Sequence, residues 1–283
     1  MPHITIGPDI GGTVELHYED RGTGRPVVLV HGYPLDSRSW DKQVPALLTA
    51  GYRVITYDRR GFGRSSPASD GYDYDTLAAD LNSVLDELDL GDAVLVGHAA
   101  GTGEIARYLG EYGSARVAKA VFLAPLPPFL LRTDETPHGV DLTFFDELMA
   151  KARSRDRGAY FTELCDLFLN TAKTAGTGWD GAGETFLDIA ASTSARACVA
   201  VIPAWITDFR ADIASIDVPA LIVHGAGDRL LPVDATGRPL RTLLPRATYI
   251  EIADAPHGLL WTHADEVNEA VLAFLGDTEK PRT

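Results

Sequence analysis

Residues 94–103 read VLVGHAAGTG, and this stretch decides the fold. Together with the residue before it, its first three residues form an unbroken apolar run, which suits a strand buried on both faces of a parallel sheet. Gly97 and Gly101 then bracket three residues, and because glycine has no Cβ they allow a sharp bend where a strand and a helix approach closely. The stretch therefore predicts a tight elbow that lifts Ala99 above the edge of a sheet, at the N-terminus of a helix whose dipole favours negative charge.

Similar apolar runs recur along the chain and predict further buried strands, at 27–30, 54–57, 93–97, 120–124 and 220–225, with a last strand at YIEI, 249–252. Residues 14–20, VELHYED, alternate apolar and polar residues instead, which is typical of a half-buried antiparallel strand. Stretches 75–90 and 263–275 carry their apolar residues on one helical stripe. Strands that alternate with such helices predict an α/β fold, with a mostly parallel sheet flanked by helices.

This alternation stops between about residue 126 and residue 215. The proline-rich stretch PLPPFLLRTDETP opens a region that has helical periodicity and large apolar residues but no convincing strand. We interpret this region as a helical insertion over the carboxyl edge of the sheet. The predicted organisation is an α/β core of residues 1–125 and 216–283, with a helical cap of residues 126–215.

The composition and net charge of the chain limit the kinds of molecule that it is expected to bind. The 283-residue chain has a formal net charge of −15 and a pI near 4.8. Such a surface repels phosphate backbones and anionic lipid, so we expect neither nucleic acid nor a membrane as partner. The N-terminus MPHITIGPDIGG lacks the basic and apolar regions of a signal peptide, which predicts a cytoplasmic protein. Cys165 and Cys198 lack the spacing of metal ligands, and we interpret them as two buried thiols.

Three loops that follow or precede predicted elements carry further polar groups, and they read LVHGYP (29–34), HGAGDRLLP (224–232) and DAPHGLLWTH (254–263). The order of elbow, Asp228 and His257 is the chain order of a hydrolase triad whose elbow reads G-x-S-x-G. In that arrangement the aspartate holds one ring nitrogen of the histidine, and the other nitrogen faces the elbow. Here Ala99 takes the place of the serine, and the first loop offers the N–H of Tyr33 as an oxyanion donor.

The segments HGYPLDSRSWDKQ, YDRRGFGRSS, GHAAGTGEIARYLG, FLAPLPPFLL, TDFRADI, VHGAGDRLLP and DAPHGLLWTH extend over nearly the whole chain. They resemble the cofactor-free haloperoxidases, also called non-haem chloroperoxidases, and related esterases of the α/β-hydrolase superfamily. The resemblance implies an eight-stranded sheet with a helical cap, and a small-molecule acyl substrate. It also implies that no metal, haem or other cofactor takes part.

The resemblance assigns site residues as well. The nucleophile position is Ala99, where the family has serine, the acid is Asp228 and the base is His257. The oxyanion donors would be the N–H groups of Tyr33 and Ala100. Family members hydrolyse esters and often lactones or amides, and with hydrogen peroxide they form peracids that oxidise halide.

A proline directly after the oxyanion residue goes with good perhydrolysis in this family, and Pro34 holds that position. The expected walls of the substrate pocket are Pro34, His98, Phe129, Leu130, Trp205 and Leu259. We expect His98 to pack under the elbow and His31 to orient its loop by hydrogen bonding. Other histidines, among them His224, show no ligand spacing and are interpreted as surface or core residues.

Three accounts fit Ala99. In the first, the parent protein is a serine hydrolase that forms an acyl-enzyme, and this chain is its inactive serine-to-alanine variant, because loss of a triad serine costs about 10⁶ in kcat. In the second, the protein is a natural non-catalytic relative that binds a small apolar ligand. In the third, His257 serves a cofactor-free lyase or oxygenase. The retention of Asp228 and His257 favours the first account, and the sequence leaves open the acyl group, water or peroxide as acceptor, and a homo-oligomer.

Overall fold

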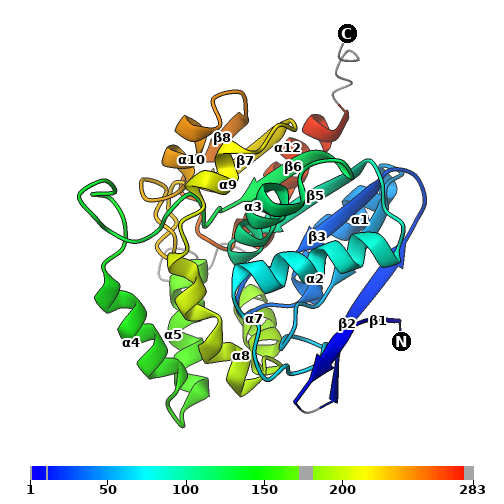
Figure 1. The fold of residues 1–283 in the computed structure, drawn as a ribbon. Helices are drawn as coiled ribbons and strands as arrows, with labels where there is room; N and C mark the ends of the chain where they lie inside the picture. Colours follow the sequence, from blue (N-terminus) through cyan, green and yellow to red (C-terminus); the bar gives the residue numbers. More distant parts are fainter. Residues whose placement is uncertain (1, 11, 172–180, 277–283) are drawn as a thin grey trace.

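The computed structural model describes residues 2–10, 12–171 and 181–276 and contains one eight-stranded sheet (Figure 1). The spatial order is β1-β2-β4-β3-β5-β6-β7-β8, and pairing is antiparallel between β1, β2 and β4 and parallel elsewhere. The strands are β1 (His3–Asp9), β2 (Gly12–Arg21), β3 (Pro26–Val30), β4 (Arg53–Tyr57), β5 (Ala93–His98), β6 (Val117–Leu123), β7 (Ala220–Gly225) and β8 (Thr248–Ile252). The predicted α/β fold with an eight-stranded, mostly parallel sheet is confirmed.

One strand, β1, was not visible in the residue pattern. Its sequence HITIGPD contains Gly7 and Pro8, and its register with β2 shifts between Thr5 and Gly7. A proline is tolerated in an edge strand because its missing N–H is not needed there. These two residues and the shift obscure the alternation by which a strand is usually recognised.

Helices cover both faces of the sheet, and the side chains of β3 alternate between them. Val27 and Leu29 lie in the apolar core shared with α1 (Gln43–Thr49) and α12 (Ala264–Gly276). Val28 and Val30 lie in the core shared with α2 (Tyr74–Glu87) and α3 (Ala100–Tyr112). The helices predicted at 75–90 and 263–275 are confirmed as α2 and α12. Shorter helices are η1 (Ser37–Trp40), α10 (Gly237–Leu243) and α11 (Leu259–Thr262).

The described part of the predicted cap is helical, and Figure 1 shows α4, α5, α7 and α8 grouped beside the sheet. Its last helix, α9, packs against α3 of the core, where Arg107 forms an ion pair with Asp212. Residues 172–180 of the predicted cap, and Met1, Gly11 and 277–283 of the predicted core, lie outside the described residues. The helices are α4 (Leu142–Ala152), α5 (Arg157–Leu169), α7 (Ala182–Ala191), α8 (Ala195–Ala200), η2 (Ile202–Ile206) and α9 (Arg210–Ala214).

Two general expectations can be compared with the described residues. Cys165 and Cys198 are buried free thiols, as predicted. Within the described ranges, no single helix is both long and apolar enough to cross a membrane, although the bent pair Ala182–Ala191 and Ala195–Ile206 passes the same test of length and composition.

The elbow between β5 and α3 is as tight as the glycine spacing predicts. A Cβ on Gly97 would lie 2.9 Å from the carbonyl carbon of Gly101. A Cβ on Gly101 would lie 2.3 Å from the carbonyl oxygen of Val30 and 2.8 Å from that of His31. Because these neighbours are backbone atoms of β3 and of the loop after it, they cannot rotate away, and the first turn of α3 packs directly on the central strand.

We expect Gly101→Ala to lower the free energy of unfolding by about 1–3 kcal/mol, the usual range for overpacking a close contact. The measurement is the urea midpoint followed by circular dichroism. Gly158→Ala is the matched control, since a Cβ there meets only a side-chain oxygen of Asp156 at 3.5 Å. Equal midpoints for the two variants would contradict this account of the elbow.

Candidate active site

Ala99 occupies the bend of the elbow in a strained conformation. Its φ and ψ angles are 49° and −118°, a combination that residues other than glycine rarely adopt. Backbone strain of this kind costs of the order of 1–3 kcal/mol and persists where the surrounding structure imposes it. The N–H of Ala99 donates to the carbonyl oxygen of Leu123 (3.0 Å), which ties the bend to the end of β6. The methyl group is therefore held at a defined point above the carboxyl edge of the sheet.

Asp228 and His257 form a close pair, as predicted, although they lie on loops after different strands. Nδ1 of His257 lies 2.7 Å from Oδ2 of Asp228. The N–H groups of Leu230 and Leu231 donate to Oδ1 at 2.9 and 2.8 Å. Burial alone would raise the pKa of Asp228, but His257 and the hydrogen bonds from both neighbouring histidines hold that pKa well below its usual range. The group is thus an ionised carboxylate with both oxygens held in place.

The carboxylate determines the tautomer of His257. Because a carboxylate only accepts, Nδ1 carries the proton in the neutral ring and Nε2 then carries the lone pair. Nε2 is buried and has no hydrogen-bond partner among the described residues. His257 lines the same small cavity as Ala99, so the structure brings together the three residues that the sequence predicted for the triad positions.

A second histidine, His224, also contacts the carboxylate, and the sequence interpretation as an ordinary surface or core histidine missed it. Its Nε2 lies 3.2 Å from Oδ2 of Asp228 and 3.0 Å from the carbonyl oxygen of Leu231. The available signal was its place at the carboxyl end of β7, four residues before Asp228. Spacing rules for metal ligands do not detect a histidine that supports a carboxylate.

The loop after β3 places the predicted oxyanion residue at the cavity. Tyr33 and Ala100 both line it, and Ala100 is the first residue of α3, where N–H groups have no acceptor within the helix. His31 donates from Nδ1 to the carbonyl oxygen of Gly32 (2.8 Å) and accepts the N–H of Arg59 on Nε2 (2.9 Å). Burial, followed by the charge of Arg59, lowers the pKa of His31 to about 4, so the ring is neutral and orients the loop.

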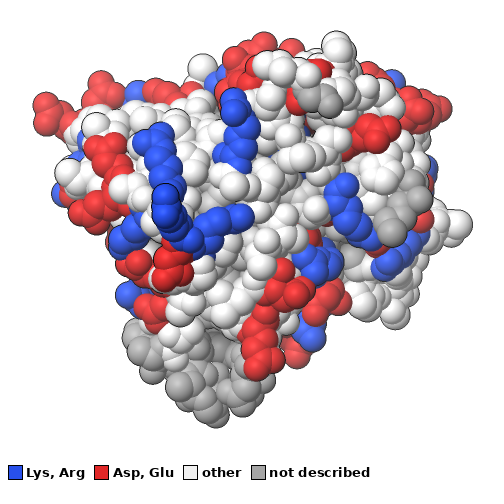
Figure 2. Space-filling model, turned by 90° about the horizontal axis from the view of Figure 1, so that it is seen from below, with Lys and Arg blue, Asp and Glu red and all other residues white. Residues whose placement is uncertain are grey.

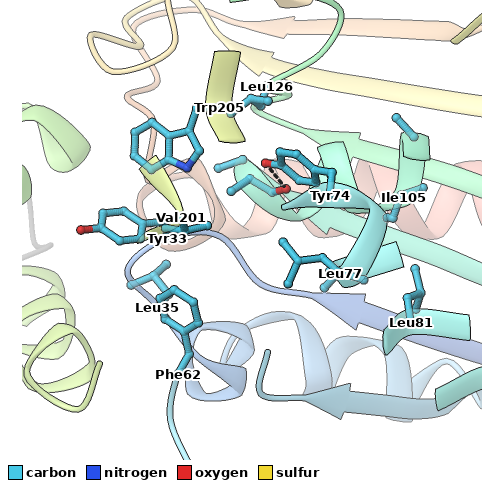
Figure 3. Close-up of a cluster of buried hydrophobic side chains, with 14 of the residues drawn as sticks. Tyr33, Leu35, Phe62, Tyr74, Leu77, Leu81, Ile105, Leu126, Val201 and Trp205 are labelled. Atoms are coloured by element: carbon cyan, nitrogen blue, oxygen red, sulfur yellow. Dashed lines mark hydrogen bonds between the residues drawn. The ribbon is translucent and has the colours of Figure 1, made fainter. Parts of the chain in front are cut away.

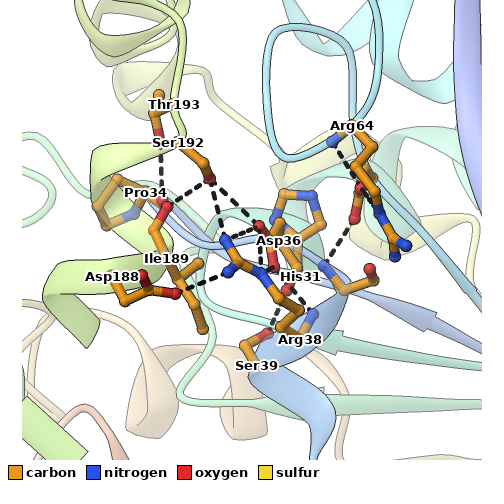
Figure 4. A network of polar contacts seen from close by, with 12 residues as sticks. His31, Pro34, Asp36, Arg38, Ser39, Arg64, Asp188, Ile189, Ser192 and Thr193 are labelled. Atoms are coloured by element: carbon orange, nitrogen blue, oxygen red, sulfur yellow. Dashed lines mark hydrogen bonds and ion pairs between the residues drawn. The ribbon is translucent and has the colours of Figure 1, made fainter. Parts of the chain in front are cut away.

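This loop is also bound to the cap. The carbonyl oxygen of Pro34 accepts a hydrogen bond from Oγ1 of Thr193 (2.9 Å). Arg38 bridges Asp36 of the loop and Asp188 of α7, as Figure 4 shows. These contacts fix the peptide segment that follows Tyr33 against the helices above it.

Aromatic side chains close the site on the cap side. The rings of Tyr33 and Trp205 meet edge to face with centroids 5.1 Å apart (Figure 3). The hydroxyl of Tyr33 lies 2.6 Å from that of Tyr160 and donates to the carbonyl oxygen of Cys198 (2.9 Å). From the opposite side, Tyr74 donates to the carbonyl oxygen of Ala100 (3.0 Å).

The cavity itself is small, with a volume of about 10 Å³, enough for one water molecule. Among the predicted walls only Trp205 lines it. Three lining residues were missed, although each lies close to a predicted feature: Leu126 lies three residues after β6, and Leu230 and Leu231 lie two and three residues after Asp228. The full lining is Tyr33, Ala99, Ala100, Leu126, Trp205, Leu230, Leu231 and His257.

The other five predicted walls lie elsewhere, which corrects the sequence interpretation. Leu259 belongs to the apolar core on the opposite face of the sheet, with α1 and α12. Leu130 is buried in the core on the cap side, and Phe129 lies beneath the guanidinium group of Arg210. The carbonyl group of Pro34 is bound to Thr193, and the ring of His98 is bound to the carbonyl oxygen of His257.

His98 supports the loop of His257. Its Nε2 lies 3.1 Å from the carbonyl oxygen of His257, and its ring packs against His257 and Phe168. Burial, followed by the neighbouring His257, lowers the pKa of His98 to about 3. His98 is therefore a neutral donor under the site, as the sequence interpretation expected of its packing.

The described residues contain no group of three or more His, Cys, Asp or Glu side chains arranged to hold a metal ion. On the face seen in Figure 2, acidic and basic side chains are interspersed. The expectations about cofactors and nucleic acid remain predictions.

Comparison with known proteins identifies the class. Residues 25–264 match the alpha/beta hydrolase fold family, and the chain belongs to it. A protein of Synechocystis sp. (strain ATCC 27184 / PCC 6803 / Kazusa), provisionally named a non-heme chloroperoxidase, is 50% identical over 97% of this chain and 100% of its own. A bifunctional esterase/perhydrolase of Acinetobacter calcoaceticus is 33% identical over 93% of this chain and 96% of its own. The crystal structure of a bromoperoxidase from Bacillus anthracis is similar with a TM-score of 0.90 and 40% identity, over 98% of this chain and 100% of that one.

The neutral state of His98 predicts a pH dependence of stability. The pKa of His98 is 6.5 in the unfolded chain and about 3 in the folded protein. As the pH falls between these values, the unfolded chain takes up a proton that the folded protein does not, so the free energy of unfolding falls. We expect His98→Gln to make this fall less steep by up to about 1.4 kcal/mol per pH unit, because one titrating group is removed. Urea unfolding at several pH values between 7 and 4 measures it. The exposed His138→Gln is the control, and an identical slope in the two variants would refute the assignment.

Proposed function

We propose that this site performs acyl transfer on small carboxylic esters through a nucleophile at position 99, and that alanine leaves the present chain without one. The observation that supports this most strongly is the Asp228–His257 pair, in which His257 has an unpartnered Nε2 and lines the same cavity as Ala99. A serine at position 99 would be the nucleophile. His257 would take its proton and later give it to the leaving alcohol, and Asp228 would hold the ring.

The oxyanion of the tetrahedral intermediate would be bound by the N–H groups of Tyr33 and Ala100. Preorganised donors of this kind supply a large part of the rate in acyl transfer. The neutral His31 and the bonds from the loop to Thr193 and to α7 support such preorganisation, because they hold the peptide of Tyr33 in one position.

The strain at Ala99 supports the same proposal. An alanine in an ordinary turn would relax to a common conformation, whereas this one keeps φ at 49°. The conformation is useful for a side chain that must project from the strand-to-helix bend toward a base. With alanine in that place no acyl-enzyme would form, so the site would be inactive with its other parts intact.

The walls of the cavity indicate the substrate class. The lining residues include Leu126, Trp205, Leu230 and Leu231, so we infer an ester with a small apolar acyl group. The acceptor is water or, as in the bifunctional esterase/perhydrolase relative, hydrogen peroxide. The position of Pro34 after Tyr33 supports peroxide, through the resemblance to cofactor-free haloperoxidases.

We expect Ala99→Ser to raise kcat for p-nitrophenyl acetate by several orders of magnitude over the chain as it stands, up to about 10⁶-fold, because the base and the oxyanion donors are already in place. Hydrolysis is followed by absorbance, and the acyl-enzyme is sought by mass spectrometry after rapid acid quench. The matched control is Ala99→Ser with His257→Gln, which keeps the hydroxyl and removes the base.

Activity in Ala99→Ser that the His257→Gln control retains would contradict the triad. No turnover of any ester, together with tight binding of an apolar ligand by the chain as it stands, would instead support a non-catalytic binding protein. A natural gene that encodes alanine at this position would end the account of an engineered variant.

A further inference from the structure

His224 places a second imidazole on the carboxylate of Asp228, where a catalytic triad needs only one. It is the second-to-last residue of β7, is fully buried, and points Nε2 at the oxygen of Asp228 that also binds His257. The ring nitrogens of two histidines therefore converge on one carboxylate oxygen, at 3.2 and 2.7 Å. Burying such a cluster of polar groups costs free energy unless the groups form hydrogen bonds with one another.

The protonation of His224 follows from its neighbours. Nε2 lies 3.0 Å from the carbonyl oxygen of Leu231, and a carbonyl only accepts, so Nε2 carries the proton. The same N–H is shared with Oδ2 of Asp228. Leu231 in turn donates its own N–H to Oδ1 of the same carboxylate (2.8 Å). His224 and Leu231 thus hold the two oxygens of Asp228 from both sides, in a closed ring of hydrogen bonds.

A glycine allows the start of α10 to pack directly on the imidazole ring of His224. Gly237 begins α10, and a Cβ at this position would lie 2.3 Å from Nδ1 of His224 and 3.0 Å from its Cγ. The first turn of α10 therefore presses directly on the ring and leaves it no room to swing away from Asp228. The other ring nitrogen, Nδ1, has no hydrogen-bond partner among the described residues, so the contact with Asp228 and Leu231 is what orients the ring.

We propose that His224 is a positioning residue of the acid–base pair: it fixes the plane of the Asp228 carboxylate and takes up part of its charge, and so sets the hydrogen bond that Nδ1 of His257 donates to Asp228. The expected effect of His224 on kcat rests on the proposed acyl-transfer function. Its expected effect on the hydrogen bond between His257 and Asp228 does not. His224 does not line the cavity, so it acts through Asp228 and not on the substrate.

The consequence for catalysis is specific. Without the N–H of His224, Oδ2 keeps only the hydrogen bond from His257, and the carboxylate can rotate about the two N–H groups on Oδ1, so the imidazole of His257 is held less well when it receives the proton. The wall formed by Leu230 and Leu231 remains, because their N–H groups still bind Oδ1. The loss therefore falls on kcat and leaves KM nearly unchanged.

The first experiment compares His224→Leu and His224→Gln in the Ala99→Ser background. Leucine fills the space without a donor, whereas the amide nitrogen of glutamine can take the place of Nε2. We expect kcat for p-nitrophenyl acetate to fall about tenfold in His224→Leu, as for loss of a hydrogen bond to a charged acceptor, with KM changed less than about twofold. We expect His224→Gln to restore most of the loss. An unchanged kcat in His224→Leu would overturn the proposal.

A second pair of variants leaves His224 itself intact. Gly237→Ala pushes a methyl group against the ring, and we expect it to reproduce the fall in kcat. Gly183→Ala on α7 is the matched control, because its Cβ would meet its nearest neighbour, Sγ of Cys165, at an ordinary 3.8 Å. If Gly237→Ala behaves like Gly183→Ala, the seating of the ring does not matter and the proposal fails.

The third readout needs no activity and uses the chain as it stands, with Ala99. The proton on Nδ1 of His257, bonded to Asp228, gives a far-downfield proton resonance. We expect this resonance to move in His224→Leu and Gly237→Ala and to stay in place in Gly183→Ala. If it moves while Ala99→Ser remains inactive on esters, the positioning role stands and the proposed function fails. If it stays in place in all three variants, the positioning role is refuted whatever the activity.

Discussion

The close packing of the first turn of α3 on the central strands is the constraint on which the rest of the site depends. Gly97 and Gly101 allow the backbone of α3 to touch the carbonyl groups at the end of β3, and the chain can then turn from β5 into α3 within a few residues. The cost of that turn appears at Ala99, whose φ is positive. The same turn brings the start of α3 and the loop of Tyr33 to one cavity, so a single packing contact aligns groups from two strands.

The second level of organisation is electrostatic and is built around one carboxylate. Asp228 is buried and ionised, and it is stabilised by two backbone N–H groups and two imidazoles. Two buried histidines that do not face the carboxylate, His31 and His98, are kept neutral because burial lowers their pKa values. Each neutral ring then serves as a donor to a backbone carbonyl, one in the oxyanion loop and one in the loop of His257.

The cap contributes walls and anchoring. Trp205 reaches the cavity from η2, and the hydroxyl of Tyr33 reaches out of the cavity to Tyr160 and Cys198. The loop of Tyr33 is also tied to α7 through Arg38 and Asp188. The position of the oxyanion loop therefore depends on the cap as well as on the sheet, and a change in cap packing would shift this loop at the site.

The sequence by itself determined the fold class, the elbow and the order of the three triad positions. Buried strands require apolar runs, and a bend this tight requires Gly97 and Gly101, so these features are local and can be read along the chain. The edge strand β1 escaped because Gly7 and Pro8 interrupt its pattern. Only the tertiary structure decided which side chains surround the site. Leu259 lies two residues after His257 yet faces the opposite side of the sheet, whereas Leu230 and Leu231 face the cavity. His224 meets Asp228 because the loop after β7 folds back over the strand end, and no periodicity in sequence records such a contact.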